Sequence, residues 1–292
     1  MIHRPDWTVA KQTLPINLGG NVHYDYFLHK QVSEIVANSD LHDYPNEHVL
    51  YEAISDYYST PIENIAIGHG ATEVLERLVK IHRDRKFYIV SPTFEMVEVY
   101  CRIYNVEYQL INDWEIMRIN DPEAVLYVAT PNGQTGVWID PNDIIHRSFH
   151  TIILDMVYHE FCPDPNVYLS MPLDRNVVTI HSISKTLGLA GLRVGWAIGN
   201  KDVIAQLQQI RSNYITNTAA AVVVPAVIHL TREVVERMLD TKQLLESSYD
   251  CNSCYGNFVL FKQRNALTDK YGYRATSGGY RMALMDMRTL NG

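Results

Sequence analysis

Short runs of consecutive apolar residues, rich in Val and Ile, recur along the first two thirds of the chain. Helical or loop segments separate most of these runs, and each run is short enough to form one strand. Strands that are apolar at consecutive positions are typical of parallel sheets with both faces buried. The pattern therefore predicts an α/β fold with a mainly parallel, seven-stranded sheet and helices on both faces. The predicted strands are residues 65–67, 87–90, 106–110, 124–129, 151–154, 177–180 and 194–198.

A second pattern, with apolar residues three or four apart, indicates helices before and after the strand-rich region. The helices expected from this spacing are residues 49–57, 201–213 and 219–247. Short strands at 258–261 and 281–284 predict a small α+β lobe, and we expect a ligand crevice between the lobes. The predicted domains are residues 1–40 for an N-terminal arm and part of the small domain, 41–213 for the large domain and 214–292 for an abbreviated small domain.

The composition favours a protein that acts on a small molecule. The 292 residues are 47% hydrophobic and 20% charged, with a formal net charge of -8 and a pI near 5.8. Nucleic acids and anionic membranes bind basic surfaces, so the charge argues against both partners. No apolar run of about 18 residues is present, and the opening MIHRPDWTVAKQ lacks the apolar core of a secretory signal. We therefore expect a cytoplasmic protein.

The cysteines and histidines do not indicate a metal site. Cys251 and Cys254 form a C-x-x-C pair, but one pair is too few to close a zinc site and no thioredoxin-like pattern surrounds it. The twelve histidines lack metal-ligand spacing, and His159-Glu160 does not begin an H-E-x-x-H motif. We expect free thiols and no bound metal.

The most informative segment is residues 181–196, HSISKTLGLAGLRVGW. Ser182, Ser184 and Lys185 follow a predicted strand, and a glycine-rich stretch leads from them to Arg193. Hydroxyls and a planar guanidinium hold a phosphate dianion through charge-assisted hydrogen bonds, while an amine forms an imine with an aldehyde. This combination suits a phosphorylated aldehyde.

Two further segments are compatible with such a ligand, although each is weak alone. The sequence Gly68-His69-Gly70-Ala71-Thr72-Glu73 joins a predicted strand to a predicted helix, and a helix start attracts anions. A Gly-x-Gly after a strand is common, however, and Glu73 replaces the third glycine of a dinucleotide motif. Asp155 ends the strand at 151–154. It is either a plain loop acid or a carboxylate that pairs with a pyridinium nitrogen.

These motifs resemble those of fold-type I pyridoxal-phosphate (PLP) enzymes. They follow the same order along the chain, and the resemblance extends from about Asn21 to Arg281. Within them the chain resembles the class I/II, histidinol-phosphate aminotransferase-like group, and its SxSK and GLAGLR strings carry most of the likeness. The resemblance implies PLP as cofactor, carried by Lys185 as a Schiff base, with Asp155 on the pyridine nitrogen and Tyr158 on the ring hydroxyl. It further implies that Ser182, Ser184, Arg193, Ala71 and Thr72 hold the cofactor phosphate, that Phe94 stacks on the ring, and that Tyr44 reaches the neighbouring site of a homodimer.

On the substrate side, the resemblance implies that Arg281 clamps a carboxylate, a task that suits a bidentate guanidinium. Arg274 matches an arginine that helps to bind a distal phosphate, and Asn21 is a candidate substrate contact. Asn257 also falls at a family position, where a structural role and a functional role are equally open.

The chain departs from the family pattern in four places. The segment Thr130-Pro131-Asn132-Gly133-Gln134-Thr135-Gly136 stands where the family usually reads PNNPTG, so Gly133 replaces the asparagine that bonds the ring hydroxyl. Either Asn132 substitutes through a shifted loop or Tyr158 holds that oxygen alone. Met156 replaces a common glutamate. The small lobe is shorter than usual, and residues 18–24 resemble the family's NENP segment only loosely.

The expected reaction is amino transfer from an amino acid or an amino-alcohol phosphate, such as histidinol phosphate, to a 2-oxo acid such as 2-oxoglutarate. Lys185 would act as the base while Arg281 holds the substrate. A PLP-dependent decarboxylase or lyase and a degenerate, non-catalytic scaffold are the open alternatives. A PLP-sensing regulator is not expected, because it would need a basic DNA-binding helix before Tyr44 and the sequence shows none there. A serine acyl enzyme, suggested by S-x-x-K at 182–185, would need S-D-N and K-T-G motifs that the sequence lacks.

Overall fold

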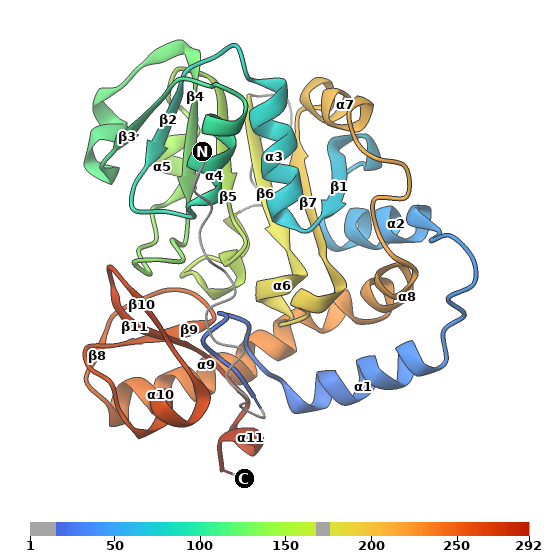
Figure 1. The fold of residues 1–292 in the computed structure, drawn as a ribbon, viewed down its shortest axis with the longest axis vertical. Helices are drawn as coiled ribbons and strands as arrows, with labels where there is room; N and C mark the ends of the chain where they lie inside the picture. The colour runs from blue at the N-terminus through green and yellow to red at the C-terminus, as the bar shows by residue number, and fades with distance from the viewer. Residues whose placement is uncertain (1–15, 168–175, 292) are drawn as a thin grey trace.

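The large sheet carries the seven predicted strands. The computed structural model describes residues 16–167 and 176–291, so the first fifteen residues of the predicted arm lie outside it. The strand order is β1-β7-β6-β5-β4-β2-β3 (Figure 1), and each neighbouring pair is parallel except the two pairs that β7 makes. The predicted mainly parallel sheet is confirmed. The strands are β1 Ile65–His69, β2 Phe87–Val90, β3 Tyr108–Ile111, β4 Asp121–Ala129, β5 Phe149–Asp155, β6 Val177–Ser182 and β7 Val194–Gly199.

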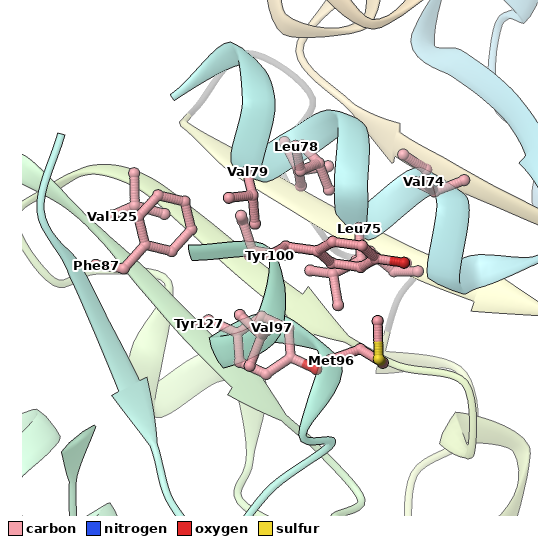
Figure 2. Close-up of a cluster of buried hydrophobic side chains, with 14 of the residues drawn as sticks. Val74, Leu75, Leu78, Val79, Phe87, Met96, Val97, Tyr100, Val125 and Tyr127 are labelled. Atoms are coloured by element: carbon pink, nitrogen blue, oxygen red, sulfur yellow. The ribbon is translucent and has the colours of Figure 1, made fainter. Parts of the chain in front are cut away.

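Helices cover both faces of this sheet, as predicted. One face packs against α3 Ala71–Ile81, α4 Met96–Ile103 and α7 Lys201–Gln209, and the other against α2 Glu47–Tyr58, α5 Pro141–Ile144 and α8 Thr218–Val227. In β4, Val125 and Tyr127 belong to the cluster beneath α3 and α4 (Figure 2), whereas Leu126 and Val128 belong to the cluster beneath α5. Successive residues therefore enter different cores, which explains why the strands are apolar at consecutive positions.

A second, antiparallel sheet with strand order β10-β11-β9-β8 forms the small lobe. Its strands are β8 Cys251–Asn252, β9 Phe258–Phe261, β10 Arg274–Thr276 and β11 Gly279–Ala283, accompanied by α9 Thr231–Ser248, α10 Ala266–Tyr271 and α11 Met287–Asn291. Strands β9 and β11 confirm the two predicted late strands. The helix expected over 219–247 is instead divided, because a 3-10 turn at Ile228–Leu230 separates α8 from α9.

The segment Thr218–Ser248 contains an 18-residue window that is long and apolar enough, by length and composition alone, to cross a membrane. Half of that window is buried inside the protein, where Val223 and Val227 share a cluster with Leu50 and Ile54 of α2. A helix that packs in a protein core is apolar for this reason.

The N-terminal arm connects the two lobes. Leu18 donates a backbone hydrogen bond to Tyr271 and accepts one from Ala283, so the arm extends along the small lobe. The helix α1, Tyr26–Ala37, follows, and its Leu28 is buried with residues of α2 and α8. The arm therefore touches both sets of elements before the chain enters the large sheet (Figure 1). The predicted domain boundaries stay predictions.

A buried arginine fixes α3 against the sheet. Arg77 donates to the carbonyl oxygen of Ile67 in β1 at 2.6 Å and to that of Leu207 in α7 at 3.0 Å, and it pairs with Glu73 at 2.9 Å. Charged groups are costly to bury unless hydrogen bonds satisfy them, and here the protein provides those partners. Arg77 thereby sets the position of the first turn of α3 relative to the end of β1.

We expect Arg77→Met to lower the free energy of unfolding by about 3 kcal/mol, because two carbonyl groups and one carboxylate lose a charged donor. Urea denaturation followed by circular dichroism measures this change. The matched control is Arg83→Met on the exposed end of the same helical region, which should change stability by no more than about 0.5 kcal/mol. Equal effects of the two substitutions would contradict the anchoring role of Arg77.

Candidate active site

The carboxyl ends of β4, β5 and β6 meet at one edge of the large sheet. Because these strands are parallel, Asp155 at the end of β5 lies between Ala129, the last residue of β4, and Ile180 of β6. Strand β6 ends at Ser182, and the short helix α6, Ile183–Thr186, carries Lys185. Open α/β sheets bind their ligands at this edge. The topology therefore brings the predicted acid and the predicted amine to one place.

Lys185 lies in a positively charged setting that disfavours its protonated form. Its Nζ donates a hydrogen bond to the backbone carbonyl oxygen of Asn21 at 2.7 Å. Burial, together with the guanidinium groups of Arg281 and Arg193, lowers the pKa of Lys185 from 10.5 to about 7, against an opposing effect of Asp155. A substantial fraction of the amine is then neutral near pH 7, the form that acts as a nucleophile or a base.

Asp155 is buried, and a neighbouring strand supports it. The Tyr127 hydroxyl donates to Asp155 Oδ2 at 2.8 Å, and the backbone N–H of Val157 donates to Oδ1 at 3.4 Å. Burial raises the pKa of Asp155, while both hydrogen bonds and the positive charge of Lys185 act to lower it. Sequence reasoning missed Tyr127. The signal was a single hydroxyl within an otherwise apolar strand, one strand away from the acid.

The start of α3 has features that favour the binding of an anion. Gly70 precedes the helix with a φ of 78°, and a Cβ at this position would lie 2.5 Å from Nη2 of Arg193. Glycine therefore allows both the left-handed backbone and the close approach of the guanidinium. The N–H groups of Ala71 and Thr72 belong to the first turn of α3, where helices leave donors without intrahelical partners and favour negative charge.

The two serines of the SISK segment are hydrogen-bonded to each other. The Ser182 hydroxyl, which has one proton to donate, has two acceptors within reach: Ser184 Oγ at 3.0 Å and the carbonyl oxygen of Val194 at 2.8 Å. Ser182 Oγ in addition accepts from the N–H of Ser184 and so caps α6. Ser184 is thus the better placed serine to donate to a bound phosphate, and the roles of both serines stay predictions.

Two arginines face each other in the small sheet. Arg274 of β10 and Arg281 of β11 are register partners in an antiparallel pair, so their side chains lie on the same face of the sheet. Both guanidinium groups lower the pKa of Lys185. Arg281 is buried and donates through Nη1 to the carbonyl oxygen of Gly133, and within the described residues its Nε has no hydrogen-bond partner. The pair offers positive charge to an anionic substrate.

Arg274 also connects this pair to the segment that contains Phe94. Its Nη2 lies 3.9 Å from Oε1 of Glu95, the residue directly after Phe94. Phe94 is partly buried against the cluster beneath α3 and α4. Its predicted position over the cofactor ring stays a prediction.

The loop that departs from the family pattern is closed by its own hydrogen bonds. Asn132 donates to the carbonyl oxygen of Pro92 at 2.7 Å and accepts from the N–H groups of Gln134 and Thr135. A Cβ on Gly133 would lie 2.9 Å from the hydroxyl oxygen and from one ring carbon of Tyr158. The Asn132 side chain thus holds the loop together, and its predicted contact with the cofactor stays a prediction.

The arm contributes a second polar layer beside Lys185. The Nδ2 of Asn257 lies 3.5 Å from the carbonyl oxygen of Asn21 and 3.4 Å from Nδ1 of His23. His23 is fully enclosed, and burial, with the positive charges of His29 and Lys185, lowers its pKa to about 3. Sequence reasoning did not identify His23, because a histidine in an irregular segment carries no pattern that points to a site.

Tyr44 does not join this group within its own chain. Its side chain is 75% exposed and stacks on Tyr214, with ring centroids 4.2 Å apart. The residues gathered around Lys185 are buried or half-buried. A role for Tyr44 at a site therefore requires a second chain and stays a prediction.

In the protein without added ligand, we expect the Lys185 amine to titrate near pH 7, because its charged form is buried among guanidinium groups. Reductive methylation with ¹³C-formaldehyde, followed by NMR over pH 5 to 11, measures the pKa of each lysine. Exposed lysines provide the reference, with a pKa near 10.4. Lys185→Ala assigns the signal by its loss. Removal of one positive neighbour in Arg281→Met should raise the pKa. A Lys185 signal that titrates above about pH 10 would contradict the assignment.

The chain matches a family model and curated relatives. The model described as aminotransferase class I and II matches residues 16–251. A histidinol-phosphate aminotransferase from Pyrococcus furiosus is 26% identical over 271 residues, which cover 86% of this chain and 78% of the relative.

Solved structures show the same fold. A histidinol-phosphate aminotransferase from Sinorhizobium meliloti, in complex with pyridoxal 5'-phosphate, has a TM-score of 0.74 at 18% identity and covers 95% of this chain and 88% of its own. An L-threonine-O-3-phosphate decarboxylase from Porphyromonas gingivalis has a TM-score of 0.69 at 18% identity, with coverage of 91% and 94%.

The residues at the sheet edge fit PLP. An amine with a lowered pKa suits the aldehyde, a buried acid suits the pyridine nitrogen, and Arg193 beside the first turn of α3 suits the phosphate. Among the described residues, Asn21, His23, Asn257 and Arg281 each keep a buried polar atom without a partner, which a polar ligand can satisfy. This chain is a PLP-dependent enzyme that belongs to the aminotransferase class I and II family.

Proposed function

We propose that this aminotransferase takes its amino group from an anionic donor, such as an amino acid or an amino-alcohol phosphate of the histidinol-phosphate kind. The acceptor would be a 2-oxo acid such as 2-oxoglutarate. The observation that supports the proposal is the pairing of Arg274 with Arg281 on one face of the small sheet. The positive charges of both residues lower the pKa of Lys185. Two guanidinium groups suit a phosphate on the donor and the two carboxylates of the acceptor.

The residues of the site divide the chemistry between them. When bound, PLP supplies a conjugated ring that withdraws electrons from the substrate's amino carbon. Lys185, whose amine is neutral in a substantial fraction of molecules near pH 7, removes the proton from that carbon. Arg281 holds an anionic group of the substrate and so orients the C–H bond toward the amine. Asp155, held by Tyr127, would place its carboxyl group beside the pyridine nitrogen of the bound cofactor.

We further propose that the enzyme works as a homodimer in which Tyr44 reaches the cofactor phosphate of the partner. Its support is the exposed stack of Tyr44 on Tyr214. Exposed aromatic pairs are costly in water and are enriched at protein interfaces.

The proposal predicts the absorbance changes of the purified protein loaded with PLP. We expect a visible band near 420 nm that falls on addition of histidinol phosphate, with a gain near roughly 330 nm, and that returns with 2-oxoglutarate. Lys185→Ala is the control, and it should show no change with donor. Carbon dioxide release from a phosphorylated amino acid in the absence of acceptor would instead indicate a decarboxylase. A loaded enzyme that responds to no phosphate-bearing donor would contradict the proposed donor class.

We expect substitutions of Arg274 and Arg281 to affect the kinetics in different ways. We expect Arg274→Met to raise KM for a phosphate-bearing donor about 10-fold or more, with little change for a donor that has an uncharged side chain. Arg281→Lys should lower kcat/KM for both donors, because an ammonium group cannot make the bidentate contact. Steady-state kinetics with the two donors measure both changes. Arg264→Met is the matched control on the exposed surface of the same lobe. Equal losses for both donors in Arg274→Met would rule out its selective role.

A further inference from the structure

We propose that Asn21, on the N-terminal arm, is a positioning residue that fixes the Tyr158 hydroxyl and the Lys185 amine for the cofactor. The sequence resemblance suggested a substrate contact for Asn21, whereas its contacts in the structure point to the cofactor side. This inference rests on the PLP chemistry of the family and is independent of which amino donor the enzyme uses.

Asn21 touches both groups at once. Its Nδ2 donates to the hydroxyl oxygen of Tyr158 at 2.5 Å, and its backbone carbonyl oxygen accepts from Nζ of Lys185 at 2.7 Å. Asn21 is only 3% exposed, so the protein shields both contacts from solvent. One residue of the arm therefore links two side chains that the large lobe supplies.

The backbone of Asn21 is shaped for this double contact. Its φ of 57° lies in the left-handed region, which asparagine tolerates better than most residues. The N–H of Asn21 donates to the carbonyl oxygen of Leu18, which closes a tight turn, and Asn257 supports the carbonyl oxygen of Asn21. The turn directs the carbonyl group toward Lys185 and the side-chain amide toward Tyr158.

Gly133 explains why the amide comes from the arm. A side chain at position 133 would collide with the Tyr158 ring and hydroxyl, since even a Cβ would lie 2.9 Å from them. Tyr158 is held in that place by an edge-to-face contact with Phe258, with centroids 5.7 Å apart. A polar side chain at position 133 would therefore require Tyr158 or the loop to shift. Asn21 approaches the hydroxyl without this clash.

The direction of the hydrogen bond gives Asn21 its effect. Because the amide donates to the Tyr158 oxygen, the phenolic proton is left to donate to another acceptor, such as the ring oxygen of bound PLP. A donor to that oxygen stabilises its negative form. The amide and the hydroxyl then form a short chain in which each bond strengthens the next.

The test measures cofactor binding without any amino donor. The proteins are the wild type, Asn21→Gly, Tyr158→Phe and the double variant, and the probe is PLP itself. Asn21→Gly keeps the left-handed backbone and the carbonyl group while it removes the amide. Asn105→Gly is the matched control, since Asn105 is also left-handed, with a φ of 55°, but exposed.

We expect Asn21→Gly to weaken PLP binding about 3- to 10-fold and to raise the pH midpoint of the visible band by roughly 0.5 to 1 unit. Tyr158→Phe should show the same changes, and the double variant should be no worse than Tyr158→Phe, because the two residues act in series. Asn21→Asp keeps the size of the side chain but accepts a hydrogen bond from the Tyr158 hydroxyl. This variant should raise the pH midpoint of the visible band further. Asn105→Gly should alter neither quantity.

Additive effects of Asn21→Gly and Tyr158→Phe would overturn the proposal, as would a PLP affinity and a midpoint that Asn21→Gly leaves unchanged. A lower Tm in Asn21→Gly with unaltered cofactor binding would mean that Asn21 only holds the arm. Because no amino donor is present, failure of the proposed donor class leaves this test intact. Conversely, a wild-type spectrum that responds to amino donors would support the proposed function but not the role of Asn21.

Discussion

The burial of an amine among guanidinium groups is the constraint on which the site depends. Arg281, Arg193 and Arg274 all place positive charge near Lys185. Like charges in a poorly solvated place cost free energy, and the chain reduces that cost in part by keeping the amine neutral. Asp155 supplies the opposing negative charge nearby. Anionic ligands offset the rest of this free energy cost. The same charges that lower the pKa of Lys185 therefore also attract phosphate and carboxylate groups.

The positive charge around Lys185 contrasts with the charge of the whole protein, whose formal net charge is -8. Four basic groups nevertheless lie together, with Lys185 and Arg193 at the sheet edge and Arg274 and Arg281 on facing strands of the small sheet. Positive charges gathered in one place attract small anions even when the net charge of the protein is negative. The rigid parallel sheet matters here, because it holds the acid, the amine and the anion site at fixed separations.

Much of the fold was predictable, because strands buried on both faces leave a continuous apolar signal. Lys185, Asp155 and Arg193 were predictable for a related reason: each lies in a short segment whose neighbours restrict its chemistry. The division of the late helix at Ile228–Leu230 was not, since the apolar spacing continues through the break. Tyr127 and His23 were missed because their roles depend on strands and loops that meet only in three dimensions. The sequence marked Gly133 as a departure, but only the packed position of Tyr158 explains it.

The contacts of the site join segments that are far apart along the chain. The Asn21 to Tyr158 bond spans 137 positions, the Arg281 to Gly133 bond 148 and the Asn257 to Asn21 contact 236. Non-local contacts form slowly, because the loops that they close lose entropy before the contact is gained. The site therefore exists only in the fully assembled molecule, and a ligand that binds there stabilises that state alone by mass action. Bound cofactor consequently contributes to the stability of the folded chain, in addition to its chemistry.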